Sequence, residues 1–342
     1  MFNSLGVRCS VDNLHDTPVI HTLGPARCGT MGTMENDDDL TANLIALPRQ
    51  TRRLVDASLS ISEIDTERPE YLHALLCQLG LPRSRQEDRK FYRESGKVSM
   101  MLEAGSVATG RGKWKDLPLP YGTHPRLVLY HLCSEAVRTQ SNVIDVGGSL
   151  REFLGRVGIG IGGQSFNRFK DQMTALSVCR MTLAMFTDQR VKQITTSPIR
   201  SFEAWLHPDP AQGQLWPDTI ELHPDFFETL AEHAVPLDPR AIGALQHSAL
   251  ALDIYTWLAH RLHRVRAPNG VKLSWGNLRE QFGQEYKTSK DFKKAFRPAL
   301  FKVRVAYPTA KLDEEIGGIR LFNSPPPVPK TRIVLPFQVK AR

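Results

Sequence analysis

The sequence lacks the cysteine pairs and the long apolar runs that define several large classes of protein. No Cys-x-x-Cys pair occurs, and the five cysteines are odd in number and widely spaced: Cys9, Cys28, Cys77, Cys133 and Cys179. A zinc ribbon or a disulfide framework is therefore unsupported, and isolated thiols with apolar neighbours are typical of small core residues in a reducing compartment. No apolar run approaches the roughly 18 residues that a membrane-spanning helix requires.

Motifs for export and for metal catalysis are also missing. The N-terminus has no basic start followed by an apolar stretch of roughly 7–15 residues, so we predict no secretory signal and a cytoplasmic protein. The eleven histidines contain no His-Glu-x-x-His and no His-x-His. His260 and His263 have a spacing that a metal could use, but no cysteine lies nearby and their neighbours are basic, so we interpret both as surface residues. We therefore expect neither an enzyme nor a bound metal or cofactor.

One glycine-rich segment matches a nucleotide-binding pattern without its context. Gly158, Gly160 and Gly163 satisfy Gly-x-Gly-x-x-Gly, which marks a dinucleotide site only between the strand and the helix of a βαβ unit. Here a predicted helix precedes the glycines. We interpret them instead as a tight turn between two helices, where the missing Cβ also allows the backbone to approach a phosphate closely.

The sequence does contain a concentrated basic segment. The 45 residues from 260 to 304 carry a net charge of +9, whereas the whole chain carries +8, so all other residues sum to −1. The segment contains three acids, Glu280, Glu285 and Asp291. It contains twelve cations: Arg261, Arg264, Arg266, Lys272, Arg279, Lys287, Lys290, Lys293, Lys294, Arg297, Lys302 and Arg304. A solvated helix face is one interpretation. A nucleic-acid surface is the other, because phosphate contacts and counterion release dominate such binding.

The chain is long enough for two modest domains, at roughly 100–200 residues per domain, and its N-terminal part has weak structural signals. Residues 1–33 show no hydrophobic period, and Met34 is an alternative start of the protein. Residues 35–70 hold nine acids and four arginines, a net charge of −5 that would repel DNA. We therefore predict a disordered or weakly structured extension over residues 1–70.

Residues 71–235 are predicted to form a first winged-helix domain. It starts with a short amphipathic helix over 71–81, a β-hairpin over 91–103 and a Gly/Lys-rich loop over 108–122. The later elements are a helix over 124–140, a strand over 143–146, a helix opened by a capping box at Ser149–Glu152, a helix over Ser165–Ser177, and further strands. Helix, strand, helix–turn–helix and hairpin is the element order of a winged helix.

The same order recurs over residues 236–326, which we predict to be a second winged helix. Its elements are a long helix over about Pro239–Val265, a strand over 271–275, a short helix over Trp275–Phe282, a helix opened by Thr288–Asp291, and a hairpin at Gly317-Gly318. Pro298 lies inside the last helical pattern, so that helix is either kinked or ends near Arg297 and restarts. Residues 327–342 form a Pro-rich basic tail. The predicted fold class is thus α+β, with two tandem winged-helix domains.

The second capped helix of each domain is the candidate recognition element, because a major groove about 12 Å wide admits one α-helix. The polar candidates are Gln164, Ser165, Asn167, Arg168 and Lys170 in the first domain, and Lys290, Lys293, Lys294, Arg297, Lys302 and Arg304 in the second. Lysine acts as a point charge for phosphate, whereas arginine and asparagine form bidentate contacts with bases. We therefore expect the lysines to supply affinity, and Asn167, Arg168 and Arg297 to supply specificity.

Two blocks of this sequence resemble RepA-type plasmid replication initiators. The first is LPYGTHPRLVLYHLCSEAVRTQSNVIDVGGSLREFLGRVGI; the second comprises DIYTWLAHRLHRV, LSWGNLREQFGQEY, FKKAFRPALFKVRVAYPTAKL and GGIRLFNSPPPV, and together they cover roughly residues 90–326. The resemblance implies a non-enzymatic bacterial protein, associated with the plasmid or nucleoid. It would bind direct repeats of double-stranded origin DNA, melt adjacent AT-rich DNA and recruit host replication proteins such as an initiator and a helicase. It places the DNA contacts on the helices over 164–177 and 289–304.

Two other functions are compatible with the same patterns. A winged-helix transcriptional regulator would use the same surface at a promoter instead of an origin. An enzyme with an unrecognised site would show metal- or nucleotide-dependent turnover. The sequence also leaves open whether the active form is a monomer or a homodimer.

Overall fold

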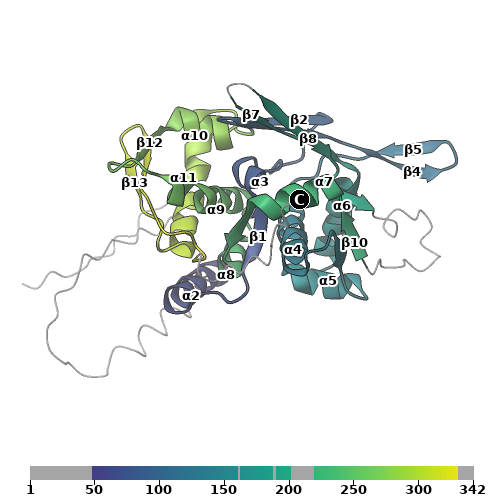
Figure 1. Cartoon of the computed structure of the whole chain (residues 1–342), viewed down its shortest axis with the longest axis horizontal. Helices are drawn as coiled ribbons and strands as arrows, with labels where there is room; N and C mark the ends of the chain where they lie inside the picture. Colours follow the sequence, from purple (N-terminus) through teal and green to yellow (C-terminus); the bar gives the residue numbers. More distant parts are fainter. Residues whose placement is uncertain (1–47, 161, 188–189, 202–218, 330–342) are drawn as a thin grey trace, which may run out of the picture. The chain divides into compact units, whose positions relative to one another are not determined.

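Helices and short antiparallel sheets alternate along the computed structural model, which describes residues 48–160, 162–187, 190–201 and 219–329 (Figure 1). Two segments of the chain repeat the order helix, strand, helix, helix and strands, so the predicted α+β class with two tandem winged helices is confirmed. The predictions for residues 1–47, including the alternative start at Met34, lie outside the described residues, as does the tail beyond residue 329.

The predicted N-terminal extension contains a helix that the sequence did not indicate. α2 (Arg49–Glu63) buries Leu54 and packs against α8 (Pro239–Leu245) and α11 (Ser289–Ala306). The prediction of a weakly structured segment through residue 70 is therefore wrong for this helix. Leu54 and Ile61 lie two helical turns apart and both contact the core, but the acids around them obscured this short apolar face.

A strand and a short helix replace the single helix predicted over residues 71–81. The elements are β1 (Glu70–His73), α3 (Ala74–Gln78) and the strand that pairs with β1, β11 (Ala234–Leu237). His73 ends β1 and caps α3, because its Nδ1 accepts a hydrogen bond from the Leu75 amide at 3.1 Å. The boundary that we predicted between residues 235 and 236 falls inside β11, since β11 is one strand.

The first winged helix is built on α4, most of whose residues are buried. Its elements are α4 (Thr123–Thr139), β6 (Val143–Asp145), α5 (Leu150–Val157), α6 (Gly163–Val178), β9 (Ile199–Ser201) and β10 (Thr219–Leu222). Ser149 caps α5 as predicted, because its Oγ accepts from the Glu152 amide at 3.2 Å. The Glu152 carboxylate accepts from the Gly148 amide at 3.1 Å. The strands form an antiparallel sheet in the order β6-β10-β9.

The hairpin predicted over residues 91–103 is confirmed, and it shares a sheet with strands that follow α6. In sheet order these strands are β2 (Lys90–Ser95), β3 (Val98–Glu103), β7 (Arg180–Phe186) and β8 (Val191–Thr196). The Gly/Lys-rich loop is a second hairpin instead, formed by β4 (Ser106–Gly110) and β5 (Lys113–Asp116). This hairpin extends as a two-stranded arm (Figure 1).

The long helix predicted at the start of the second winged helix is interrupted. The elements here are α7 (Pro224–His233), β11, α8, α9 (Ala249–Arg261) and a 3₁₀ turn (Leu262–Arg264). Ser248 causes the break between α8 and α9, because its Oγ accepts from the Ala251 amide at 3.2 Å and starts a new helix. The prediction of one helix over Pro239–Val265 is therefore wrong.

The second winged helix has its elements in the predicted order. They are α9, β12 (Val271–Ser274), α10 (Trp275–Phe282), α11, β13 (Leu312–Glu315) and β14 (Gly318–Leu321), with the strand order β12-β14-β13. The buried face of α11 includes the residues that we predicted: Phe292, Phe296, Leu300 and Val303. α11 continues through Pro298 as one helix, so the alternative in which it ends near Arg297 is wrong.

Candidate nucleic-acid interface

The first candidate helix, α6, follows the glycine turn of the helix–turn–helix. Gly158 ends α5 with a φ of 75°, and its amide donates to the Leu154 and Gly155 carbonyls. A helix therefore precedes the glycine motif, which lacks the strand-before-glycine context of a dinucleotide site. The prediction that these glycines form the turn between two helices is confirmed.

The exposed side of α6 carries polar residues from the predicted set. Asn167 and Arg168 are exposed, and Lys170 is half-buried. Gln164 and Ser165 belong to the first turn of the helix, but the structure does not describe their side chains. The buried side includes Phe169, Met173 and Leu176. α6 thus presents an amide and a guanidinium to solvent, the groups that read base edges by bidentate hydrogen bonds.

The second candidate helix, α11, presents a longer cationic face. Thr288 caps it, because its Oγ1 accepts from the Asp291 amide at 3.1 Å. The exposed cations are Lys290, Lys294, Arg297, Lys302 and Arg304, and Lys293 is half-buried. These positive charges run from the first turn of the helix to the last. Such a row fits a polyanionic backbone, since each neutralised phosphate releases counterions.

Two of the α11 cations contact their own domain. The Lys293 ammonium nitrogen and the Arg297 guanidinium carbon each lie 5.3 Å from the centroid of the Trp275 ring. Arg297 also pairs with Glu314 on β13, with its Nε 2.7 Å from Oε1. Arg297 was expected to read bases, but here the wing holds its guanidinium. Any contact of Arg297 with a base would therefore compete with Glu314.

Arginines of α2 extend the basic surface, which sequence analysis missed. Burial lowers the pKa of His247, and the charges of Arg53, Lys302 and Arg49 lower it further. Arg49 and Arg53 are both exposed on α2, a helix that packs against α11. Their spacing of four residues, which places them on one helix face, was the available signal. The net negative charge of the surrounding segment hid it.

A buried ionic cluster joins the two winged helices. We define this cluster as Arg83, Arg93, Arg126, Asp253 and Glu285, whose side chains are 1% to 9% exposed. Arg126 on α4 pairs with Asp253 on α9 at 2.7 Å. Arg83 contacts both acids, at 3.3 Å from Asp253 and 3.2 Å from Glu285. α4 is the first helix of one winged helix and α9 is the first helix of the other. The cluster therefore links the two helices against which α6 and α11 pack.

The arginines of the cluster keep the Asp253 carboxylate charged. Burial alone would raise the pKa of Asp253, but the charges of Arg126, Arg83 and Arg93 outweigh burial and lower it. Gly80 is required beside this carboxylate, because a Cβ there would lie 2.7 Å from its atoms. The sequence did not predict the cluster, since its members are far apart along the chain.

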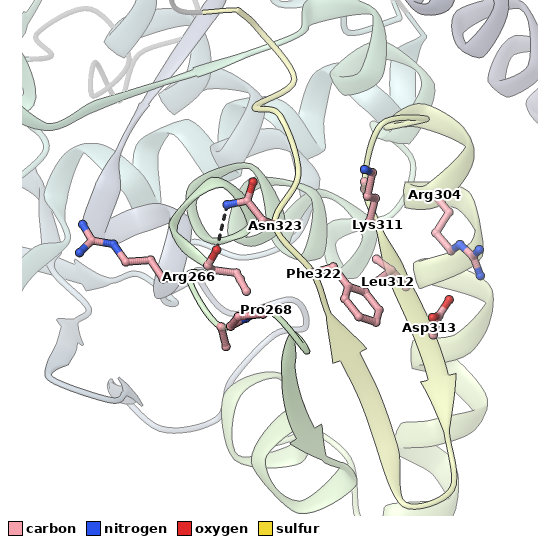
Figure 2. Close-up of a pocket in the computed structure, with 11 residues that line it drawn as sticks. Arg266, Pro268, Arg304, Lys311, Leu312, Asp313, Phe322 and Asn323 are labelled. Carbon is pink, nitrogen blue, oxygen red and sulfur yellow. Dashed lines mark hydrogen bonds between the residues drawn. The ribbon is translucent and has the colours of Figure 1, made fainter.

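A cleft of about 800 Å³ lies at the base of the second wing. Its charged lining residues are Arg266, Arg304, Lys311 and Asp313. Figure 2 shows Arg266 pointing away from the wing strands and Arg304 on α11 at the other side of them, so the two cations do not converge. Within the described residues, no group of three or more His, Cys, Asp or Glu side chains is placed to hold a metal ion. The described helices include none that is long and apolar enough to span a membrane.

Comparison with known proteins finds a family match over the central part of the chain. Residues 119–277 match the family model described as "Plasmid encoded RepA protein". A crystal structure of RctB domains 2 and 3 covers 72% of this chain and 94% of its own, with 13% identity and a TM-score of 0.41. A selenomethionine derivative of the same two domains covers 69% and 84%, with 14% identity and a TM-score of 0.42. No curated protein matches the chain.

Proposed function

We propose that this protein, whose residues 119–277 match the family model of plasmid-encoded RepA proteins, initiates plasmid replication by binding double-stranded origin DNA through both winged helices. The supporting observation is that the two winged helices each present an exposed polar helix. α6 exposes Asn167 and Arg168, while α11 exposes Lys290 and Lys294. Each helix is backed by a buried apolar face, so its polar side is free to enter a major groove.

The two helices have different chemistry and therefore different roles. The cations of α11 neutralise phosphates, which supplies affinity without sequence information. The amide and guanidinium of α6 read base edges, which supplies discrimination. The exposed Arg49 and Arg53 of α2 add to the phosphate-binding surface, because α2 packs against α11.

The arrangement of the two domains favours directly repeated sites. The buried ionic cluster links α4 to α9, so one chain carries two different recognition helices in one linked unit. Because the two recognition helices of one chain differ, the DNA site that they bind has no two-fold symmetry. Several chains bound in the same orientation would then occupy direct repeats of that site. A homodimer would instead suit inverted repeats, as two-fold symmetry demands. We therefore propose that the monomer is the form that binds the repeats.

Origin binding leads to initiation by steps that need no catalytic group of this chain. Occupied repeats would promote melting of adjacent AT-rich DNA and recruit the host initiator and helicase. Occupancy would also set the plasmid copy number. The role is non-enzymatic and uses no metal or cofactor, and it is carried out in the bacterial cytoplasm at the plasmid or nucleoid.

The test is binding of the full chain to a duplex with direct repeats beside an AT-rich segment, and to a scrambled duplex of the same length. We expect tighter binding to the repeats, and a fall of log affinity with log salt of roughly 0.9 per neutralised phosphate. A plasmid that carries this origin should be maintained only when the chain is supplied. Equal affinity for both duplexes would overturn the proposal.

A transcriptional regulator is the second candidate, because the same exposed helices would serve at a promoter. The two functions differ in the consequence of DNA binding, which is plasmid replication for an initiator and a change in transcription for a regulator. Maintenance of an origin plasmid by the chain supports the initiator. Control of a promoter reporter, without plasmid maintenance, supports the regulator.

A further inference from the structure

The β4–β5 hairpin is an arm whose tip carries cations and an aromatic ring. Arg111, Lys113 and Lys115 are exposed, and Trp114 is 71% exposed. Residues 106–116 contain three cations and one acid, Asp116. Exposure of the apolar Trp114 ring to water is unfavourable, so a partner that covers the ring would be stabilised by the contact.

The acid of the arm is used to fix its base. Asp116 pairs with Arg89 at 3.1 Å and accepts a hydrogen bond from the Ser106 hydroxyl at 2.5 Å. Arg89 also donates to the Ala104 carbonyl at 2.9 Å, and Val107 is buried. The base is therefore held in place by these contacts, and the positive charge of the arm lies on Arg111 in its turn and on Lys113 and Lys115 along β5.

The base of the arm is attached to the candidate recognition helix. Gly105 lies against the end of α6 so closely that a Cβ would be 2.0 Å from the Val178 carbonyl oxygen. A cleft of about 670 Å³ lies between the arm and α6, lined by Lys115 on one side and by Arg168 and Lys170 on the other. The arm and the polar face of α6 therefore border the same cleft.

We propose that this arm binds the sugar-phosphate backbone of duplex DNA beside the groove that α6 enters. The inference rests on the proposed function and adds a contact that belongs to neither winged helix. Lys113, Lys115 and Arg111 pair with phosphates, and the flat ring of Trp114 covers a sugar face. A two-stranded ribbon is narrow enough to lie along a major groove, which is about 12 Å wide. Because phosphates carry no sequence information, the arm strengthens binding to every duplex equally.

The test compares two variants that each lose two exposed cations. K113A/K115A removes arm charges, whereas the control R68A/K90A removes exposed cations that do not line the cleft. We expect the arm variant to bind cognate and scrambled duplexes about tenfold more weakly, with a salt slope less steep by roughly 1.8, since each lost phosphate contact contributes about 0.9. The control should keep the wild-type slope. W114A should weaken binding without changing the slope, because its contact is apolar.

Hydroxyl-radical footprinting gives the second readout. The wild-type chain should protect a short backbone segment beside the α6 half-site, and K113A/K115A should lose that segment alone. Unchanged affinity, slope and footprint in the arm variant, with normal binding by the wild-type chain, would overturn the arm contact and leave the proposed function standing. Absence of duplex binding by the wild-type chain would overturn both.

Discussion

The guanidinium of Arg126 holds both carboxylate oxygens of Asp253, with its Nε 2.7 Å from Oδ1 and its Nη2 2.9 Å from Oδ2. Its remaining N–H groups donate to the carbonyls of Leu81, Pro82 and Gly122. One side chain thus joins the first helix of each winged helix and the loop between α3 and β2. Such a pair need not add net stability over an apolar core, but losing one partner leaves a buried charge unpaired.

We predict that Asp253→Asn strongly destabilises the chain. The substitution removes the carboxylate that pairs with Arg126, a residue only 3% exposed, and the expected loss is about 3–5 kcal/mol of unfolding free energy. Urea denaturation followed by circular dichroism measures it. The matched control is Glu314→Gln, because that carboxylate also pairs with an arginine but its side chain is 42% exposed. Wild-type stability of Asp253→Asn would show that the buried ionic cluster is not a required link.

A second prediction concerns pH. Burial, together with the nearby His233, lowers the pKa of His73 to about 4, and burial likewise lowers the pKa of His131 to about 4. Between that value and the ordinary histidine pKa of about 6.5, the unfolded chain binds more protons than the folded chain. The unfolding free energy should therefore be constant above about pH 6.5 and fall as the pH is lowered toward 4.

The control for this pH dependence is His73→Asn. Asparagine retains an oxygen that can cap α3, as the His73 Nδ1 does by accepting from the Leu75 amide, but it does not titrate. Denaturation at pH 7.5, 6 and 5 should show a shallower loss of stability for this variant. An identical pH dependence in variant and wild type would mean that His73 is not one of the responsible groups.

Sequence patterns identified elements whose signals are local. The buried face of α11 was predictable because Phe292, Phe296 and Leu300 recur at helical spacing, and the Ser149 cap because its partner lies three residues away. Elements defined by distant partners were missed. β1 is a strand because β11 pairs with it, and Asp253 is a link because Arg126 reaches it from another domain. The sequence pattern around each residue does not reveal which distant residue it will contact.

The candidate site shows the same limit. The cationic positions of α11 follow from composition and helical spacing, and most of them are exposed. The pairing of Arg297 with Glu314 could not be read from the sequence, because it depends on the wing folding back onto the helix. Arg297, one of the three side chains that we expected to read bases, therefore already has an acidic partner.

This pairing yields a third prediction. Glu314→Gln should release the Arg297 guanidinium and remove a negative charge from the wing, so affinity for scrambled duplex should rise several-fold, in keeping with the modest strength of exposed pairs. The rise should shrink as salt is added, because exposed charges are screened. Asp313→Asn is the control, since it removes a neighbouring charge without freeing Arg297. Equal gains in both variants would mean that general electrostatics, and not Arg297, is responsible.

The fourth prediction separates affinity from specificity. K290A/K294A should weaken binding to cognate and scrambled duplexes by the same factor, because both lysines are exposed point charges. N167A or R168A should instead reduce the difference between the two duplexes, by about 1–3 kcal/mol for each lost bidentate contact. Lys293 is avoided in this test because it also packs on Trp275. Competition assays with both duplexes measure the two effects, and equal losses of discrimination in both classes of variant would contradict the division of roles.

The last prediction concerns the length of DNA that one chain covers. Successive major grooves on one face of a duplex are about 34–36 Å apart, or 10–10.5 base pairs. With α6 in one groove and α11 in the next, a monomer should protect about two helical turns, and origin repeats should be roughly twenty base pairs long and directly oriented. Footprinting at a concentration where sedimentation shows a monomer tests this length. The matched variants are R168A and K294A, one on each helix, which should each weaken protection most in its own half of the repeat. Protection of a single half, with binding sensitive to only one of the two variants, would mean that the other winged helix has a function other than holding DNA.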